Sequence, residues 1–504
     1  MANPLYDRLF GRHAGSDAPF LIDGTGGETG FAEFLALAAR IAGALTEAGL
    51  RPGDRVAAQV GKSREALALY AACAQAGLIF LPLNTAYTGA ELAYFLGDSG
   101  AACLVCDPAR EQELAPVAAE SGARLETLDA GGGGTLMARA ETQPDSFATV
   151  ARGEEDLAAF LYTSGTTGRS KGAMLTQRNL LSNAATLAEL WRFTDRDVLL
   201  HALPIFHTHG LFVATNVMLE AGGAMIFLPK FDAAEVTRLM PRATAMMGVP
   251  TFYTRLLEEA AFTREAAAGM RLFISGSAPL LEETHRQFEA RTGHRILERY
   301  GMTETNMSTS NPYEGERRAG TVGFALPGVE LKITDPESGL DLPQGEIGMI
   351  EVRGPNVFRG YWGMPEKTAA ELREDGFFIT GDLGRVDAEG YVQIVGRGKD
   401  LIISGGLNVY PKEVEQVLDA VRGVLETAVI GVPHGDLGEA VVAVVVPEPG
   451  AAPEEAELMA AAAALARFKH PKRIAFLDAL PRNAMGKVQK GALRERFAGL
   501  FRDA

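Results

Sequence analysis

Short apolar runs alternate with longer segments whose apolar residues recur every three or four positions through most of the chain. The runs 55–60 and 78–83 predict buried strands, and the stretch 63–76 between them predicts a helix with one apolar face. The same alternation predicts later strands at 224–229, 243–249 and 272–275, and helices at 233–240 and 281–291. This order of elements is typical of α/β layers built on largely parallel sheets.

The pattern changes after residue 322. Short strand-like pieces at 331–334, 348–353 and 390–395 are separated by Gly, Pro and Asp, which indicates a mostly antiparallel, β-rich subdomain. After the charged turn 396–399 the chain predicts a helix from Pro411, a strand at 440–446 and an alanine-rich helix at 454–465. We therefore expect an α/β fold class: a large N-terminal domain of α/β layers plus the β-rich subdomain, 1–398, and a small α+β C-terminal domain, 399–504.

The composition is that of an ordinary folded protein, with 47% apolar and 22% charged residues among 504. The formal net charge of −16 argues against a broad nucleic-acid surface and against a polybasic membrane anchor. Between residues 467 and 496, however, basic residues clearly outnumber acidic ones. Most of these cations are expected to be solvated, and some to face a polyphosphate ligand.

Only three cysteines occur, which is too few for a disulfide framework and fits a reducing compartment. Cys103 and Cys106 form a C-x-x-C, but the run 101–106 predicts a strand, so alternation would point the two thiols to opposite faces. We expect buried thiols rather than a redox pair. The N-terminal stretch has no apolar segment typical of a secretory signal, and the run 440–446 is too short to span a bilayer. The expectation is a cytoplasmic protein with no membrane partner.

The segment 162–172, Tyr-Thr-Ser-Gly-Thr-Thr-Gly-Arg-Ser-Lys-Gly, follows a predicted strand at 157–161. Its glycines leave backbone N–H groups uncovered, its hydroxyls add donors, and Lys171 adds a positive charge, which together predict a phosphate-binding loop. It is not a Walker loop. Counted from Gly165, the sixth position is Ser170 rather than Gly, and the residue after Lys171 is Gly172 rather than Ser or Thr.

This segment resembles the signature loop of the adenylate-forming enzymes, which include acyl-CoA synthetases, nonribosomal adenylation domains and luciferases. Five further segments resemble core motifs of that superfamily in the same order: 76–85, 300–305, 380–382, 396–400 and 481–487. The resemblance extends over residues 30 to 495. Within the superfamily, segments 203–210, 249–255 and 299–307 look most like the malonyl-CoA synthetases, which join malonate, and often methylmalonate, to coenzyme A using ATP and Mg2+.

The resemblance implies a nucleotide site. Glu304 would be the Mg2+ ligand, since Mg2+ prefers carboxylate oxygen, Thr303 would bond the α-phosphate, and Asp382 and Arg397 would hold the ribose. The remaining implied nucleotide-binding residues fall into two groups and one further residue. For the phosphates they are Thr163, Ser164, Gly165, Thr166, Thr167, Gly168 and Lys171, and for the adenine pocket Gly276, Ser277, Ala278, Glu298, Arg299, Tyr300 and Gly301; Met302 is also implied.

The chemistry explains why such residues are needed. A carboxylate must first become an acyl-adenylate, and the oxygens that attack and depart carry charge that cations stabilise. By resemblance, Lys487 stabilises the transferring carboxylate and α-phosphate. Lys399 matches the hinge about which a mobile C-terminal domain turns after adenylation. The turn carrying Gly405 and Gly406 then approaches the pantetheine arm of coenzyme A.

By the same resemblance His207 borders the acyl pocket and gates the thiol tunnel. His207 and His209 form a His-x-His, but no third ligand lies near in sequence, so a metal site is the weaker interpretation. A malonate bound for reaction keeps one ionised carboxylate, which needs a cationic partner. Arg255 and Arg286 are the candidates for this clamp, because an arginine fork fits a carboxylate. Thr208 and Met307 are expected to limit the pocket to malonate and a short branch.

The function expected is ATP-dependent ligation of malonate to coenzyme A through an acyl-adenylate, releasing AMP and pyrophosphate. The nearest alternatives are a CoA ligase for another small acid and a stand-alone adenylation domain. The two mismatched Walker positions argue against a P-loop kinase, and the retained Glu304, Asp382 and Lys487 argue against an inactive ATP-binding regulator. The resemblance also makes a protein lysine acyltransferase acting on Lys487 a plausible partner.

Overall fold

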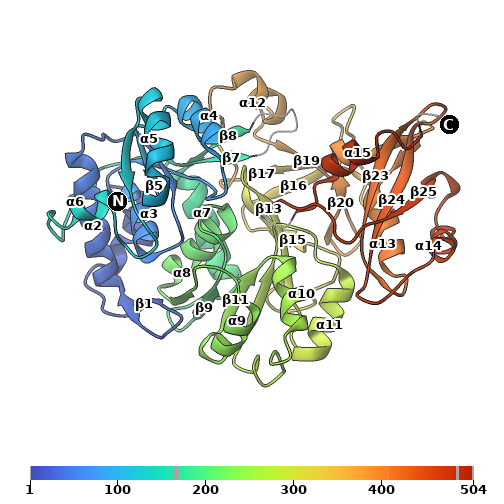
Figure 1. The fold of residues 1–504 in the computed structure, drawn as a ribbon, viewed down its shortest axis with the longest axis horizontal. Helices are drawn as coiled ribbons and strands as arrows, with labels where there is room; N and C mark the ends of the chain where they lie inside the picture. Colours follow the sequence, from blue (N-terminus) through green and yellow to red (C-terminus); the bar gives the residue numbers. More distant parts are fainter. Residues whose placement is uncertain (1, 164–169, 406, 484–486, 502–504) are drawn as a thin grey trace. The chain divides into compact units, whose positions relative to one another are not determined.

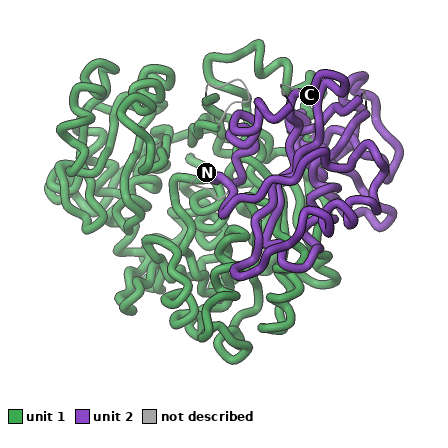
Figure 2. The backbone as a smooth tube through the Cα atoms, turned by 45° about the vertical axis from the view of Figure 1, so that its right-hand side comes forward, with its two compact units in different colours: residues 1–330, 352–378 green, residues 331–351, 379–504 purple. Residues whose placement is uncertain are grey.

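The structure is a computed structural model that describes residues 2–163, 170–405, 407–483 and 487–501. The chain divides into two compact units, shown in different colours in Figure 2. The first unit contains residues 1–330 and 352–378, and the second contains residues 331–351 and 379–504. The predicted division into domains 1–398 and 399–504 stays a prediction.

One seven-stranded sheet of the first unit contains the earliest predicted strands, and Figure 1 draws it with helices packed around it. Strands β7, β4, β3, β5 and β6 run parallel, whereas β8 and β18 are added antiparallel at one edge. The predicted helix between β3 and β4 is α3 (Arg64–Gln75), and Ser63 caps it by accepting a hydrogen bond from the backbone N–H of Ala66. The strands are β3 (Arg55–Gln59), β4 (Ile79–Pro82), β5 (Cys103–Cys106), β6 (Arg124–Thr127), β7 (Leu157–Thr163), β8 (Lys171–Thr176) and β18 (Gly360–Tyr361).

The interpretation of the C-x-x-C is confirmed in this sheet. All four residues of β5 are buried, and the three cysteines are free thiols. Burial raises the pKa of Cys103 to about 12 and that of Cys106 to about 11. A thiol so strongly protonated at neutral pH is a poor nucleophile, so these cysteines serve as small apolar side chains.

A nine-stranded sheet forms the other half of the first unit, in the order β15-β14-β13-β12-β11-β9-β10-β1-β2. Its middle strands run parallel, and their buried side chains pack with helices α9, α10 and α11 in one apolar core. The strands are β1 (Pro19–Ile22), β2 (Glu28–Gly30), β9 (Val198–His201), β10 (Ala224–Phe227), β11 (Ala245–Gly248), β12 (Leu272–Ser275), β13 (Leu297–Met302), β14 (Asn306–Ser310) and β15 (Phe324–Ala325). The helices include α7 (Gln177–Leu190), α8 (Asn216–Ala221), α9 (Ala233–Leu239), α10 (Pro250–Glu258) and α11 (Glu282–Thr292).

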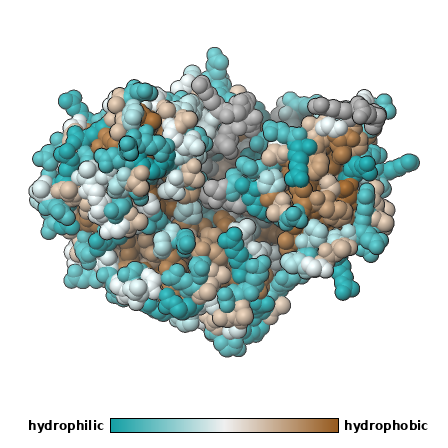
Figure 3. Space-filling model, viewed as in Figure 1, coloured by the Kyte–Doolittle hydropathy of each residue, from teal (hydrophilic) through white to brown (hydrophobic). Residues whose placement is uncertain are grey.

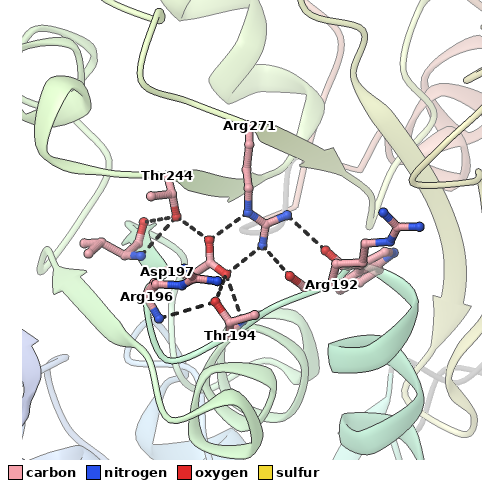
Figure 4. A network of polar contacts seen from close by, with 8 residues as sticks. Arg192, Thr194, Arg196, Asp197, Thr244 and Arg271 are labelled. Carbon is pink, nitrogen blue, oxygen red and sulfur yellow. Dashed lines mark hydrogen bonds and ion pairs between the residues drawn. The ribbon is translucent and has the colours of Figure 1, made fainter.

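A half-buried ion pair links the starts of three parallel strands in this sheet (Figure 4). Asp197, Thr244 and Arg271 each stand directly before a strand, β9, β11 and β12 respectively. The carboxylate of Asp197 accepts from Arg271 Nε at 2.7 Å and from Thr244 Oγ1 at 2.7 Å. Burial acts to raise the pKa of Asp197, but the hydrogen bonds from Arg271 and Thr244 prevail and lower it. The network lies at the amino ends of these strands. The loops that bind ligands in sheets of this kind follow the carboxyl ends.

The second unit is β-rich: it combines strands from the predicted β-rich subdomain with the strands and helices of the predicted C-terminal domain. A four-stranded sheet has the order β16-β17-β19-β20, in which β19 and β20 pair antiparallel, and a second sheet is built on the long antiparallel hairpin β23–β24. Apolar clusters cover both faces of this hairpin. The elements are β16 (Glu330–Thr334), β17 (Gly348–Arg353), β19 (Phe378–Val386), β20 (Val392–Arg397), β21 (Ile402–Ser404), β22 (Leu407–Val409), α13 (Pro411–Asp419), β23 (Val424–His434), β24 (Gly438–Pro447), α14 (Glu455–Ala462), β25 (Arg473–Phe476) and α15 (Lys490–Phe497).

Exposed apolar side chains distinguish the second unit. Within the described residues every large apolar side chain that is exposed belongs to it, including Ile403, Leu407, Leu425 and Phe476. Figure 3 shows apolar residues gathered over the strands of this unit. Among the described residues, no helix combines the length and the apolar character needed to cross a bilayer.

Candidate active site

Glu304 lies in the short connection between β13 and β14, where its side chain is buried. Its Oε1 accepts a hydrogen bond from the Tyr361 hydroxyl at 3.0 Å and one from Thr163 Oγ1 at 3.4 Å. Its backbone oxygen accepts from the N–H of Phe358 at 2.8 Å. The structure thus brings Thr163, from the predicted phosphate loop, beside the predicted metal ligand.

Tyr361 and Glu371 complete this cluster, and sequence reasoning missed both. The Tyr361 hydroxyl also donates to Glu371 Oε2 at 2.7 Å, so one proton serves two carboxylates. Burial and the charge of Glu304 raise the pKa of Tyr361, which keeps the hydroxyl protonated. Glu371 stands at the end of the short helix α12 (Pro365–Glu371), and no motif marks that helix.

Lys171 supplies the positive charge of the cluster. Its Nζ lies 3.2 Å from Glu371 Oε2 and 4.1 Å from the ring centroid of Tyr361. Lys367 pairs with the same carboxylate at 2.7 Å. Burial acts to raise the pKa of Glu371, but the hydrogen bonds from Lys367 and Tyr361 and the charge of Lys171 lower it, so the carboxylate is ionised. The predicted phosphate-binding lysine is therefore held by an acid that a polyphosphate would compete with.

The ends of the predicted phosphate loop are well defined. Strands β7 and β8 pair antiparallel, with Thr163 opposite Lys171, so the intervening residues connect two neighbouring strands. The backbone oxygen of Ser170 accepts from the Tyr94 hydroxyl at 2.8 Å. The other predicted loop residues, Ser164, Gly165, Thr166, Thr167 and Gly168, lie outside the described residues, as does Gly406.

Three separate segments converge on the predicted acyl pocket. Thr208 Oγ1 donates to Asn306 Oδ1 at 2.8 Å, and the Nδ1 of His209 lies 3.1 Å from Ser277 Oγ. His207 accepts at Nδ1 from the backbone N–H of His209 at 3.2 Å. His209 begins a π-helical segment, His209–Thr215, a geometry that is frequent at functional sites. In the described part of the chain, no group of three His, Cys, Asp or Glu side chains is placed to hold a metal ion.

The turn after β12 and strand β13 carry the predicted adenine-pocket residues. Ser277 has a φ of 72°, which is uncommon for a residue with a side chain and is tolerated here in a turn. Gly276 is buried, and a Cβ there would lie 2.3 Å from Arg299 Nη1. The neighbouring predicted residues are Ala278 in the same turn, Glu298, Tyr300, Gly301 and Met302 on β13, and the half-buried Thr303 directly after it.

The two arginines predicted to clamp malonate lie on helix surfaces. Arg286 is 69% exposed and pairs with Glu283 at 2.8 Å on its own helix, α11. Arg255 is exposed on α10. A water-exposed arginine gives little stabilisation to an ion pair, so a clamp at these positions stays a prediction without structural support. Met307, in contrast, is buried. The side-chain amide of Asn183 donates a hydrogen bond to the backbone oxygen of Met307 and accepts one from its backbone N–H.

The predicted ribose-binding pair lies in the second unit. Asp382 on β19 and Arg397 on β20 stand directly opposite each other, and Arg397 Nε lies 2.7 Å from Asp382 Oδ1. Asp382 is buried, and its backbone N–H donates to Thr380 Oγ1 at 3.1 Å. Lys399 is exposed in the single turn Gly398–Asp400 that follows. The predicted hinge is thus a short charged turn at the end of a strand.

Lys487 and Lys490 differ in their surroundings. Lys487 is exposed, and its backbone N–H and oxygen both bond Asn483, at 3.0 Å each. Lys490 Nζ instead lies 2.6 Å from Glu415 Oε1. Gly405, the predicted pantetheine contact, has a φ of 59°, a conformation that glycine adopts readily. Of the two lysines, Lys487 is exposed, whereas Lys490 is half-buried and held in an ion pair.

These features are typical of one class of protein, the two-unit α/β enzymes of the adenylate-forming type, and residues of the predicted nucleotide site lie in each unit. Two family models match the chain. The model described as AMP-binding enzyme matches residues 11–362, and the AMP-binding enzyme C-terminal domain matches residues 413–487. The chain belongs to the AMP-binding enzyme family.

Individual relatives refine this membership. The chain is 38% identical to the malonate–CoA ligase of Arabidopsis thaliana over 453 residues, covering 83% of this chain and 74% of the relative. It is also 38% identical to the feruloyl-CoA synthase of an Amycolatopsis species over 473 residues, covering 93% and 94%. The crystal structure of ATP-bound MatB from Rhodopseudomonas palustris superposes with a TM-score of 0.97 at 58% identity, covering 99% of this chain and 100% of that one.

Proposed function

We propose that the protein is an AMP-forming acid–CoA ligase that activates malonate. The observation that carries the ligase chemistry is the superposition with an ATP-bound structure over 99% of the chain. The malonate–CoA ligase of Arabidopsis thaliana supports malonate as the acid. Because a feruloyl-CoA synthase is equally identical, the acid itself must rest on the pocket and on assay. Methylmalonate is the second acid to test.

The reaction has two steps. A malonate oxygen attacks the α-phosphorus of ATP, the bond to pyrophosphate breaks, and malonyl-adenylate forms. The thiol of coenzyme A then attacks the activated carbonyl, its proton passes to solvent, and AMP leaves. Both steps develop negative charge on oxygen, so preplaced donors and cations lower the barrier.

The buried cluster in the first unit is suited to the triphosphate. Lys171, Thr163 and the glycine-rich segment would bind phosphate oxygens, with Lys171 exchanging its contact to Glu371 for a phosphate. Glu304 would hold Mg2+, because its carboxylate is buried, oxygen-only and kept in place by Tyr361 and Thr163. The ion would neutralise charge on the phosphates when it is bound. The Tyr361 hydroxyl lies between the carboxylates of Glu304 and Glu371, and its hydrogen bonds to both reduce their mutual repulsion.

The second unit would supply the groups that act in turn. The carboxylate of Asp382 accepts hydrogen bonds from the ribose hydroxyls, and its ion pair with Arg397 holds it in position. Lys487, on its exposed turn, stabilises the transferring carboxylate and α-phosphate during adenylation. Rotation about Lys399 then exchanges this turn for the one that contains Gly405, and His207 admits the thiol. The mobile domain in this proposal is 399–504, and 1–398 stays fixed.

Two further parts of the proposal concern the cell. A cytoplasmic location fits the supply of ATP and coenzyme A. An acyl group on Lys487 would remove the charge needed for adenylation, so a protein lysine acyltransferase would silence the enzyme.

The test is pyrophosphate release from ATP in the presence of coenzyme A and each of a panel of acids: malonate, methylmalonate, butyrate, benzoate and ferulate. Malonate is expected to have the highest kcat/KM, and mass spectrometry should identify malonyl-CoA. A higher kcat/KM with a monocarboxylic acid would reject malonate while retaining the ligase. No pyrophosphate release with any acid would reject the ligase.

A further inference from the structure

A lysine of the first unit joins its two large sheets at their carboxyl ends. Lys62 follows β3 of the seven-stranded sheet, and His201 is the last residue of β9 in the nine-stranded sheet. The Nζ of Lys62 lies 2.7 Å from the backbone oxygen of His201 and 2.8 Å from its Nδ1. It also lies 4.2 Å from the ring centroid of Phe227, which ends the neighbouring strand β10. Ligands of open α/β sheets bind beyond these carboxyl ends, so Lys62 lies where such sheets carry function.

This position is unfavourable for a lysine. Lys62 is half-buried as a residue, but its amino group is enclosed by protein, and this burial lowers its pKa well below the usual value. In the described part of the chain no carboxylate compensates the burial. An apolar side chain of similar length would fill the same space without the loss of hydration. The amino group is therefore expected to do more than pack.

His201 passes the contact on to a third segment. Its ring is buried, and its Nε2 lies 2.8 Å from the backbone oxygen of Gly210. Since a carbonyl oxygen only accepts, Nε2 carries the proton and Nδ1 is left to accept from Lys62. Burial and then the charge of Lys62 lower the pKa of His201 well below its usual value, so the ring is neutral, as both bonds require. Lys62, His201 and Gly210 thus form one directed line of hydrogen bonds.

Gly210 ends a segment, residues 204–210, that turns back on itself; we call it the returning segment. A Cβ on Gly210 would lie 2.1 Å from the backbone oxygen of Pro204, so the two ends of the segment touch and only glycine fits. The oxygen of Gly210 also accepts from Thr215 Oγ1 at 3.0 Å, within the π-helical segment His209–Thr215. The bond from His201 therefore fixes the returning segment at the point where the chain enters the π-helical turn.

The side chains of the returning segment are held in different ways. Thr208 Oγ1 donates to Asn306, and the Nδ1 of His209 lies 3.1 Å from Ser277 Oγ, so both have an anchor in another segment. The ring of His207 accepts from the backbone N–H of His209, so its orientation follows the backbone of its own segment. A shift of the Gly210 carbonyl should therefore move His207 more than it moves the other two.

We propose that Lys62 is a positioning residue for thioester formation: acting through the His201 ring, it fixes the returning segment and with it the place of His207. This inference rests on the proposed function, in which His207 admits the thiol of coenzyme A. In the described part of the chain neither Lys62 nor His201 bonds the Lys171 cluster, so adenylation should not depend on them. A reacting thiol must be held close to its attack geometry, and a small displacement of the group beside its path lowers the rate.

The experiment follows the two half-reactions separately in the full-length enzyme. One is pyrophosphate release from ATP and malonate without coenzyme A, and the other is conversion of supplied malonyl-adenylate and coenzyme A to the thioester. Lys62→Met keeps the length of the side chain and removes the amino group. It should leave pyrophosphate release within about twofold of wild type and slow thioester formation by about tenfold, the lower end of the cost of a misplaced reacting group.

Two further lysine variants frame this result. Lys62→Arg keeps a cationic donor, so it should recover part of the rate of thioester formation. Lys230→Met is the matched control, because Lys230 is an exposed lysine shortly after β10, and it should change neither half-reaction.

Two variants of His201 separate positioning from packing. His201→Gln can place an amide N–H near the position of Nε2 and keep the bond to Gly210, whereas the shorter side chain of His201→Asn cannot reach it. We expect His201→Asn to slow thioester formation as Lys62→Met does, and His201→Gln to retain most of the rate. Because Lys62 acts through His201, adding Lys62→Met to His201→Asn should cause no further loss. A packing role would produce losses that add and that appear in both half-reactions.

The outcomes separate this inference from the proposed function. If wild type ligates another acid but not malonate, the malonate assignment fails, and the same variants are compared with that acid. If wild type releases no pyrophosphate with any acid, the proposed function fails and the inference fails with it. If wild type makes malonyl-CoA and Lys62→Met slows both half-reactions equally, or slows neither, the positioning role is overturned. If Lys62→Met does not fold, equal rates of thioester formation in His201→Asn and His201→Gln overturn it.

Discussion

The two units hold their candidate functional residues in opposite ways. In the first unit Lys171, Arg299 and Glu304 are buried, and strand pairing or hydrogen bonds from several segments fix their surroundings. In the second unit Lys399 and Lys487 are exposed, and Lys399 lies in the single turn Gly398–Asp400. Asp382 is the exception, since it is buried against the strand that carries Arg397.

This difference corresponds to two kinds of work. Buried, preorganised groups bind a ligand without a free-energy cost of rearrangement. Exposed groups on turns are suited to entering and leaving a site. We therefore expect changes at these buried groups of the first unit to alter specificity or stability, and changes in the second to affect individual reaction steps.

The largest expected effect is at the exposed lysine of the second unit. Lys487→Ala should slow pyrophosphate release from malonate and ATP by about a thousandfold, since it removes a charge that stabilises the transition state. It should leave the conversion of supplied malonyl-adenylate and coenzyme A to the thioester intact. Lys490→Ala is the matched control, because Lys490 is bound to Glu415 and should leave adenylation unchanged. Equal loss in both half-reactions would contradict a role for Lys487 that is confined to adenylation.

The half-buried network of Asp197, Thr244 and Arg271 in the first unit should affect stability alone. Asp197→Ala is expected to lower the free energy of unfolding by about 3 kcal/mol, because it leaves Arg271 without its buried partner. Urea denaturation measures this, with Glu314→Ala at the exposed Arg192–Glu314 pair as a control expected to cost less than about 1 kcal/mol.

The same network has a defined pH dependence. The pKa of Asp197 is lower in the folded protein than in the unfolded chain, so its stabilisation is complete above the unfolded value of about 3.9. As the pH falls through the folded pKa the stabilisation is lost. The difference in unfolding free energy between wild type and Asp197→Ala should therefore narrow on acidification, and a constant difference would show that the charge is not what matters.

The hinge assignment predicts a change confined to the second step. Lys399→Pro fixes φ in the turn Gly398–Asp400. Pyrophosphate release should survive, while thioester formation from malonyl-adenylate should fall by about a hundredfold, the cost typical of a misplaced reacting group. Lys399→Ala is the control and should keep both steps. Unchanged rates in the proline variant would move the hinge elsewhere.

The smallest expected effect concerns the hydroxyl shared by two carboxylates. Tyr361→Phe removes the single hydroxyl that donates to both Glu304 and Glu371. This loss should raise the Mg2+ concentration needed for half-maximal adenylation, and it should lower kcat by about tenfold. Tyr70→Phe, at a buried hydroxyl that bonds Asn216 outside the site, is the control. An unchanged Mg2+ dependence in the Tyr361→Phe enzyme would contradict the assignment of Glu304 as the Mg2+ ligand.

The sequence predicted the elements well because their evidence is local. The apolar runs that became β3, β4 and β12, and the helix between β3 and β4, need only the spacing of neighbouring residues. The same holds for the buried thiols of β5, which follow from strand alternation. The family also followed from motifs that are each short and contiguous, and the family models match most of the chain.

The tertiary structure alone decided which charges meet. Glu371 and Lys171 are two hundred positions apart and form an ion pair because β18 is added to the sheet next to β8. Arg299, Arg255 and Arg286 carry the same side chain, and sequence spacing favoured the two that lie exposed on helices. Whether an arginine is buried depends on which strands and turns pack over it, and only the fold shows that β13 and Gly276 enclose Arg299 while α10 and α11 leave the others in water.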